Sequence, residues 1–288
     1  MPYIETAKSG IAAPIKLFYQ DTQLGKPVIF IHGWPHNSNL WEYQFNVLPK
    51  YGIRCISYDR RGFGLSDKPY DGYDYDTLAA DLKSVIDELG LQSVTLVGFS
   101  MGGGEVARYI ANYGTSKIDK VVLVASVLPY MLKTDDNPSG IPEEVFVDFI
   151  AKIQTDRAAF MVDFAKAFFG VGMIKRPVSQ AFLDATFVEV MKASSKATTD
   201  CVFSFGRTDF REDCAEINVP VLIIHGDADK IVPIEVGGKR AIERIPHAEL
   251  LIYEGAPHGL YYTEKEKLNE DLLAFIDVKT TVDKEVVF

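Results

Sequence analysis

The sequence contains little cysteine and no long apolar run. Its 288 residues include three cysteines, Cys55, Cys201 and Cys214, whose number is odd and whose spacing fits no metal site. We therefore expect reduced, buried or half-buried thiols without a disulfide or metal role. No stretch approaches the roughly 20 apolar residues of a membrane helix, and the N-terminus lacks the basic and apolar regions of a signal peptide. These absences predict a cytoplasmic protein that does not bind membranes.

Basic residues are also in the minority. The chain has 30 Lys and Arg against 40 Asp and Glu, a formal net charge of −10, and this negative field repels nucleic acids and anionic membranes. The contents of hydrophobic residues (47%) and charged residues (24%) are ordinary for globular proteins, so neither disorder nor a coiled coil is indicated. The length suits one α/β unit with an insertion. Whether the chain forms homo-oligomers is left open.

Short apolar runs rich in β-branched residues alternate with longer helical patterns. This alternation is typical of a mostly parallel central sheet with helices on both faces, the α/β class. The runs predict strands over residues 27–31, 53–58, 94–97, 120–125, 219–224 and 249–253. The longer patterns predict helices over residues 40–49, 76–89, 101–113, 234–244 and 263–276. The first residues predict antiparallel edge strands, with a turn at Gly25 and Lys26.

Between about residues 126 and 218 the alternation stops, and only helical patterns remain. They are EEVFVDFIAKI, RAAFMVDFAKAFF and SQAFLDATFVEVMKAS. We predict a helical cap over residues 127–218, inserted into a core of residues 1–126 and 219–277. A long connection after a central strand lies at the carboxyl end of the sheet, where ligands bind, so the cap should cover the site. For residues 278–288 the sequence predicts no role.

The stretch GFSMGGG, residues 98–104, stands between a predicted strand and a predicted helix. Its first five residues match G-x-S-x-G, a turn on which Ser100 would be an exposed nucleophile. The residues two before and two after the serine must be small on such a turn, and both are glycine. Gly103 and Gly104 should let the helix pack closely against the sheet. A phosphate-binding loop fits poorly, because neither G-x-G-x-x-G nor a P-loop lysine is present.

A serine nucleophile needs a base and a carboxylate that orients it. His258, in GAPHGL after the last predicted strand, is the expected base, and Asp229, in HGDADKIVP, is the expected acid. The order Ser, Asp, His is the one found in folds with this nucleophile turn. Asp227 is the alternative acid, although a role in capping its own loop suits it better.

The other four histidines are expected to have no catalytic role. His32 and His225 each end a strand before a glycine, a position that favours hydrogen bonds to loop backbone. His36 and His247 have no special context.

Two backbone N–H groups are candidates for binding the oxyanion. One belongs to Met101, at a helix N-terminus, and the other to Trp34, in the loop IFIHGWPHN after the first parallel strand. Trp34 would also form an apolar wall, or only a packing contact. Phe160, Phe164 and Phe168 recur at helical spacing in the cap. They form either the core of the cap or part of an acyl pocket.

Five motifs in order, HGWP, DRRGFGLSDKP, GFSMGGGEVARY, HGDADKIVP and GAPHGL, resemble those of the α/β-hydrolase superfamily over nearly the whole chain. The resemblance is closest to the cofactor-free (non-haem) haloperoxidases, chloroperoxidases and perhydrolases, which overlap with bacterial arylesterases. It implies an acyl-serine formed from a small ester or a short carboxylic acid, and released by water or hydrogen peroxide without any cofactor. The family's triad falls on Ser100, Asp229 and His258.

Other functions remain open for a chain of this kind. The same fold and triad occur in ligand receptors, lactamases and carbon–carbon bond hydrolases. Epoxide hydrolases and haloalkane dehalogenases have an aspartate at the nucleophile position, so Ser100 argues against both. In DRRGFGLSD, Asp59 and Arg61 are expected to anchor loops rather than react.

Overall fold

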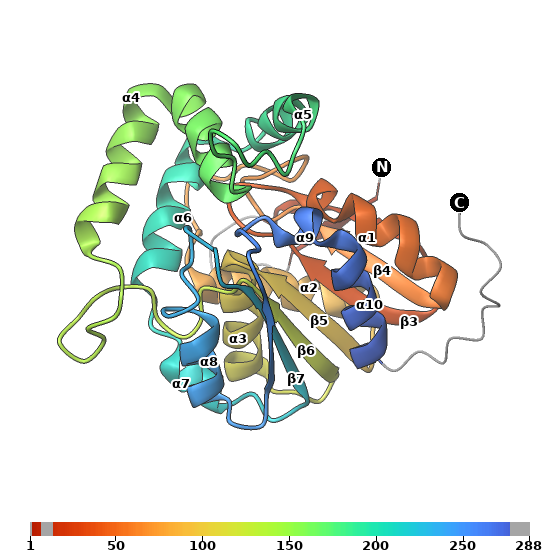
Figure 1. The fold of residues 1–288 in the computed structure, drawn as a ribbon. Helices are drawn as coiled ribbons and strands as arrows, with labels where there is room; N and C mark the ends of the chain where they lie inside the picture. Colours follow the sequence, from red (N-terminus) through yellow and green to blue (C-terminus); the bar gives the residue numbers. More distant parts are fainter. Residues whose placement is uncertain (1, 7–13, 277–288) are drawn as a thin grey trace.

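The computed structural model describes residues 2–6 and 14–276, whose strands form one sheet (Figure 1). The strands are β1 (Tyr3–Glu5), β2 (Lys16–Asp21), β3 (Lys26–Ile31), β4 (Ile53–Tyr58), β5 (Val94–Phe99), β6 (Ile118–Val124), β7 (Val221–Gly226) and β8 (Glu249–Tyr253). Their order is β1-β2-β4-β3-β5-β6-β7-β8. β1 and β2 are antiparallel to their neighbours, and the other pairs are parallel. The predicted mostly parallel sheet is confirmed.

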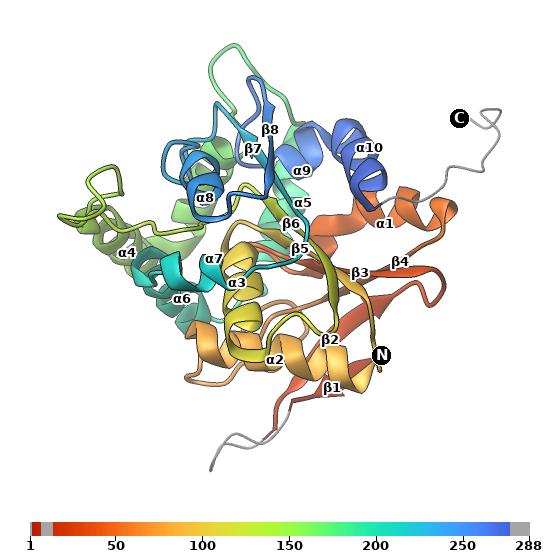
Figure 2. The ribbon, with the colours of Figure 1, turned by 90° about the horizontal axis from the view of Figure 1, so that it is seen from below.

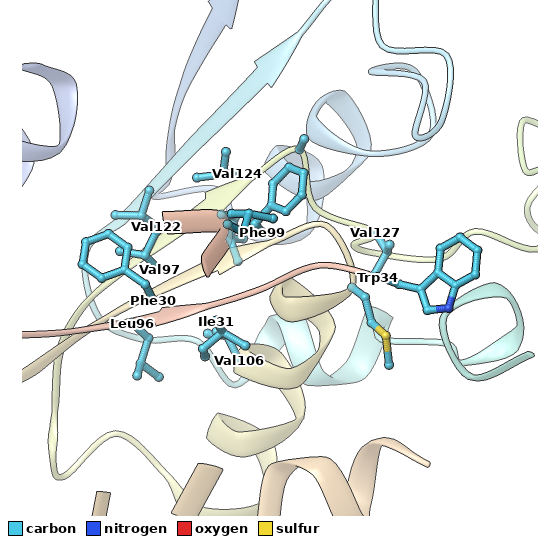
Figure 3. Packing of buried hydrophobic residues seen from close by; sticks show 14 of the residues in the cluster. Phe30, Ile31, Trp34, Leu96, Val97, Phe99, Val106, Val122, Val124 and Val127 are labelled. Carbon is cyan, nitrogen blue, oxygen red and sulfur yellow. The ribbon is translucent and has the colours of Figure 1, made fainter. Parts of the chain in front are cut away.

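The central strands are apolar because helices cover both faces of the sheet. All residues of β5 and β7 are buried, as expected for strands with no solvent-exposed face. Figure 3 shows Phe30, Val97 and Val122 in this core, and Trp34 and Val127 where the chain has left β3 and β6. β5 and β7 extend two residues beyond their predicted carboxyl ends, because glycine and histidine there obscure the apolar pattern.

The core helices lie on both faces of the sheet. Figure 2 shows α1 and α10 on one face, and α2, α3 and α8 on the other. Three predicted helices differ in detail: the first is divided into η1, α1 and η2, residues 234–237 form turns before α8, and a short helix, α9, precedes α10 at the last one. The bounds are η1 (Ser38–Trp41), α1 (Glu42–Val47), η2 (Leu48–Tyr51), α2 (Tyr75–Glu88), α3 (Met101–Tyr113), α8 (Gly238–Arg244), α9 (Leu260–Thr263) and α10 (Lys265–Ile276).

The segment between β6 and β7 is helical, and α4 to α6 lie beyond the carboxyl ends of the strands (Figure 1). Its helices are α4 (Glu143–Phe168), α5 (Gln180–Val190), α6 (Ser195–Arg207) and α7 (Arg211–Ala215). α4 is interrupted at Asp156 (φ −154°, ψ 90°), between the two predicted helical stretches. The sequence did not predict α6, which is rich in Thr and Ser. Ser194 caps its N-terminus by accepting the Ala197 N–H.

The last helix of this segment packs on the core. α7 contacts α3 and α8, and Asp213 in α7 pairs with Arg108 in α3 at 2.6 Å. The division into a core (residues 1–126 and 219–277) and a cap (residues 127–218) therefore stays a prediction, and residues 278–288 lie outside the described residues.

Candidate active site

Ser100 occupies a strained turn between β5 and α3. Its backbone has φ 53° and ψ −118°, a conformation rare for residues other than glycine. A Cβ atom on Gly98 would lie 2.7 Å from the carbonyl oxygen of Gly102, and one on Gly102 would lie 2.6 Å from the carbonyl oxygen of Ile31. The turn therefore requires glycine at both positions, as predicted.

The two glycines that follow bring α3 close to its neighbours. A Cβ atom on Gly103 would lie 2.0 Å from the Ser126 Oγ, and one on Gly104 would lie 2.6 Å from the ring of Phe210. Gly103 thus packs at the end of β6, as predicted, whereas Gly104 packs against Phe210 and Tyr75 outside the sheet and not against the sheet as predicted.

Loops after β7 and β8 bring the other two predicted side chains to the serine. His258 Nε2 is 2.9 Å from the Ser100 Oγ, and His258 Nδ1 is 2.6 Å from the Asp229 Oδ2. All three residues are buried. Three segments that are distant in sequence thus form one hydrogen-bonded chain.

Asp229 is held as a carboxylate. Its Oδ1 accepts the backbone N–H groups of Ile231 (2.8 Å) and Val232 (2.9 Å). Burial alone raises the pKa of this carboxyl, but the charges and hydrogen bonds of His258 and His225 outweigh that effect and hold the pKa well below its usual range. Asp229 can therefore orient His258 and stabilise the imidazolium form.

Asp227, the alternative acid, faces another partner. Its Oδ1 accepts the backbone N–H of Gly255 at 2.6 Å. It therefore joins the loops after β7 and β8, whereas the sequence predicted that it would cap its own loop.

The remaining histidines contact backbone groups or rings, and His225 Nε2 also lies 3.4 Å from the Asp229 Oδ2. His225 Nε2 is 2.8 Å from the carbonyl oxygen of Val232, and His247 Nε2 is 2.9 Å from that of Val219. His32 contacts the backbone of Gly33 and of Arg60. His36 is buried against the rings of Phe168 and Tyr261, a position that no sequence signal indicated.

The two residues expected to supply oxyanion donors lie next to Ser100. Met101 is the first residue of α3, where backbone N–H groups have no intrahelical acceptor. The loop carrying Trp34 passes directly over the serine, because a Cβ atom on Gly33 would lie 2.9 Å from the Ser100 Cβ. The Trp34 indole N–H donates to the carbonyl oxygen of Thr198 in α6 (3.0 Å), so the side chain contacts the helical segment.

Asp59 and Arg61 anchor loops, as expected. Asp59 accepts the backbone N–H groups of Ser38 and Leu65. Arg61 donates to both carboxylate oxygens of Asp81, at 2.6 and 2.7 Å.

A small apolar cavity of about 40 Å³ borders Ser100. One buried water needs roughly 10 to 15 Å³ by the same measure, so the space suits a group of a few atoms. Its walls come from the loops after β3, β6 and β7 and from helices α4 and α6. The lining residues are Trp34, Ser100, Val127, Met131, Ile141, Val145, Phe146, Phe149, Phe164, Phe205, Ile231 and Val232.

The three predicted pocket phenylalanines have different places. Phe164 lines the cavity beside Ser100. Phe160 stacks on Phe164 and lines a surface groove on the outer side. Phe168 packs against the His258 ring, with centroids 4.8 Å apart. Only Phe164 of this stripe therefore borders the cavity.

Several wall residues escaped sequence reasoning. Phe205 lies in the unpredicted helix α6, and Phe146 and Phe149 lie in the first half of α4. Ile231 and Val232 follow Asp229 directly, so their place beside the predicted acid was the one available signal.

All three cysteines are buried free thiols, as predicted for their burial. Within residues 2–6 and 14–276 no cluster of three or more His, Cys, Asp or Glu side chains could hold a metal ion. In the same ranges no helix has the length and apolarity needed to cross a membrane.

The fold and the site define a class of protein. A model described as "alpha/beta hydrolase fold" matches residues 26–265, and the chain belongs to this family. The predicted fold and the predicted resemblance are thereby confirmed.

Individual proteins of this family are similar to the chain over nearly its whole length. A putative non-heme chloroperoxidase from Synechocystis is 45% identical over 96% of this chain and 100% of its own length. A bifunctional esterase/perhydrolase from Acinetobacter calcoaceticus is 41% identical over 96% of this chain and 99% of its own length. The crystal structure of a bromoperoxidase from Bacillus anthracis superposes with a TM-score of 0.91 at 45% identity, covering 96% of this chain and 99% of that one.

Proposed function

We propose that the chain is a serine hydrolase of small carboxylic esters that also makes peracids from short carboxylic acids and hydrogen peroxide. The observation that carries the proposal is the hydrogen-bonded chain from Asp229 through His258 to Ser100, beside a small apolar cavity. Relatives named as a chloroperoxidase and as an esterase/perhydrolase support the same chemistry.

Acylation begins at Ser100. The Asp229 carboxylate can only accept a hydrogen bond, so His258 carries its proton on Nδ1 and Nε2 is free to accept. The Ser100 Oγ attacks the substrate carbonyl carbon while its proton passes to Nε2. The backbone N–H groups of Trp34 and Met101 stabilise the oxyanion. Collapse expels the alcohol of an ester, or water from an acid, with the proton from Nε2.

Deacylation repeats these steps with a new nucleophile. Water attacks the acyl carbonyl, gives its proton to His258 Nε2, and releases the carboxylic acid and Ser100. Hydrogen peroxide in the same position releases a peracid, which can oxidise a halide ion outside the site. The acyl group must be short, because the cavity beside Ser100 is only about 40 Å³.

Hydrolysis of a short p-nitrophenyl ester tests the nucleophile. We expect Ser100→Ala to abolish turnover, and full retained activity would overturn the assignment. Phenylmethylsulfonyl fluoride should sulfonylate the Ser100 Oγ with loss of fluoride, so that the peptide containing Ser100 gains the mass of the phenylmethylsulfonyl group in the wild type and not in the variant.

Bromination in the presence of hydrogen peroxide and bromide tests whether peroxide can accept the acyl group. We expect bromination of a dimedone substrate in acetate buffer, none in phosphate buffer, and none with Ser100→Ala. Ester hydrolysis without acetate-dependent bromination would leave a plain esterase.

A further inference from the structure

His32 is buried at the end of β3, two residues before Trp34, and both of its ring nitrogens have partners. Nε2 is 3.0 Å from the backbone nitrogen of Arg60, and Nδ1 is 2.9 Å from the carbonyl oxygen of Gly33. The residue is only 1% exposed. The sequence predicted backbone contacts for this histidine, and one of the contacted groups is the carbonyl of Gly33, a residue that lies next to Ser100.

The two partners fix the position of the ring proton. A backbone N–H can only donate, so Nε2 accepts from Arg60, and a carbonyl can only accept, so Nδ1–H donates to Gly33. The Arg60 Nη1 lies farther from Nδ1, at 3.4 Å. Burial, together with the Arg60 charge, lowers the pKa of His32 well below its ordinary value, so the ring is neutral.

The carbonyl of Gly33 belongs to the same peptide unit as the N–H of Trp34. This peptide is trans, so its C=O and N–H point in opposite directions. The Gly33 oxygen accepts a second hydrogen bond, from the His36 N–H at 3.1 Å. Two donors on one end of a planar unit fix the direction of the N–H at its other end.

We infer that His32 is a positioning residue. It orients the Gly33–Trp34 peptide so that the Trp34 N–H donates to the oxyanion of the tetrahedral intermediate, which is bonded to the Ser100 Oγ. The inference rests on the proposed function. Its geometric basis is the close approach of the Gly33 backbone to the Ser100 side chain, which leaves little room for another orientation of the peptide. An error of about 1 Å in such a group can lower a rate by roughly 100-fold.

An ion pair ties this loop to the nucleophile helix. The Arg60 guanidinium donates from Nη2 to the carbonyl oxygen of His32 and from Nε to a Glu105 oxygen, both at 2.8 Å. Glu105 also accepts from the Tyr58 hydroxyl. Both charged side chains are fully buried. A buried ion pair often stabilises a protein no more than an apolar pair of similar volume would, so stability alone does not account for this pair. Glu105 lies in α3, five residues after Ser100, so this pair links His32 to the helix that Ser100 starts.

The test compares two nearly isosteric variants. In His32→Asn the side-chain amide nitrogen can take the place of Nδ1 and donate to Gly33, whereas His32→Leu has no donor. We expect Leu to lower kcat for a short p-nitrophenyl ester by about 10- to 100-fold per titrated active site, with little change in KM, because the donor acts in the transition state. Asn should retain most of the wild-type kcat. Thermal unfolding of each variant shows any general loss of stability.

Equal per-site kcat values for wild type and Leu would overturn the inference, and so would equal losses in Leu and Asn. Should Leu fail to fold, ¹⁵N NMR of the wild-type imidazole at pH 7 decides: Nδ1 protonated and Nε2 bare supports the inference, and the opposite tautomer overturns it. Ser100→Ala separates the two proposals. Activity retained in that variant refutes the proposed function, whereas its loss together with full activity in His32→Leu refutes only the role of His32.

Discussion

Replacing Asp229 with asparagine would reverse the hydrogen bond that orients His258. The Asp229 Oδ1 accepts two backbone N–H groups, so the asparagine oxygen must occupy that place. The amide nitrogen then faces His258 Nδ1 at the present 2.6 Å contact. Because an amide nitrogen only donates, Nδ1 must accept, and the ring proton moves to Nε2, which faces Ser100.

The size of the effect follows from this tautomer. An imidazole with its proton on Nε2 cannot take the proton of the Ser100 hydroxyl. We expect kcat to fall about 10⁴-fold, as in the serine-protease triad with the equivalent change. This factor corresponds to about 5 kcal/mol of transition-state stabilisation.

The assay is hydrolysis of p-nitrophenyl acetate, and Asp227→Asn is the matched control. Asp227 lies two residues away and accepts one exposed backbone N–H, so its variant should stay within about twofold of the wild-type rate. Our reasoning is refuted if Asp229→Asn stays within tenfold of wild type, or if both variants lose the same factor.

Three further predictions concern stability and thiol chemistry. Burial, chiefly, and then the charge of His258 lower the pKa of His36 to about 3, although Glu189 opposes them, so unfolding takes up a proton below about pH 6.5. Between pH 8 and pH 5 the wild type should lose about 2 kcal/mol more stability in urea titrations than His36→Gln, and equal losses would contradict this. Gly98→Ala, whose Cβ meets backbone at 2.7 Å, should destabilise by about 1–3 kcal/mol. Gly172→Ala, with no atom nearer than 4.0 Å, should melt like the wild type, and equal melting of both would refute the packing argument. Burial raises the pKa of each cysteine thiol to about 12, so Ellman's reagent at pH 8 should label the native protein slowly and the unfolded protein at once. Rapid native labelling would contradict it.

The Ser100 turn was predictable because its constraints are local. A strained residue between a strand and a helix admits only small neighbours, and Gly98 and Gly102 record that requirement in the sequence. Asp229 and His258 were predictable from the topology of the sheet. Both follow parallel strands, and the carboxyl ends of parallel strands meet at one edge of a sheet.

The cavity walls were not predictable in the same way. Helical spacing placed Phe160, Phe164 and Phe168 on one stripe, but it does not state what each part of a stripe faces. The interruption at Asp156 and the packing of α4 over the site direct Phe164 to the cavity, Phe168 to His258 and Phe160 outward. These placements depend on tertiary contacts between segments that are far apart in the sequence.

The loop that carries Trp34 is held from two directions. On the core side, His32 and Arg60 contact its backbone, and on the other side the Trp34 indole donates to the Thr198 carbonyl of α6. The position of the loop therefore depends on two different parts of the sequence. A substitution in α6 that moves Thr198 can shift the indole, which lines the cavity, while the core contacts hold the peptide N–H. Under the proposed function, substitutions in the helical segment should therefore change the range of acyl groups that the cavity accepts. They should have a smaller effect on stabilisation of the oxyanion.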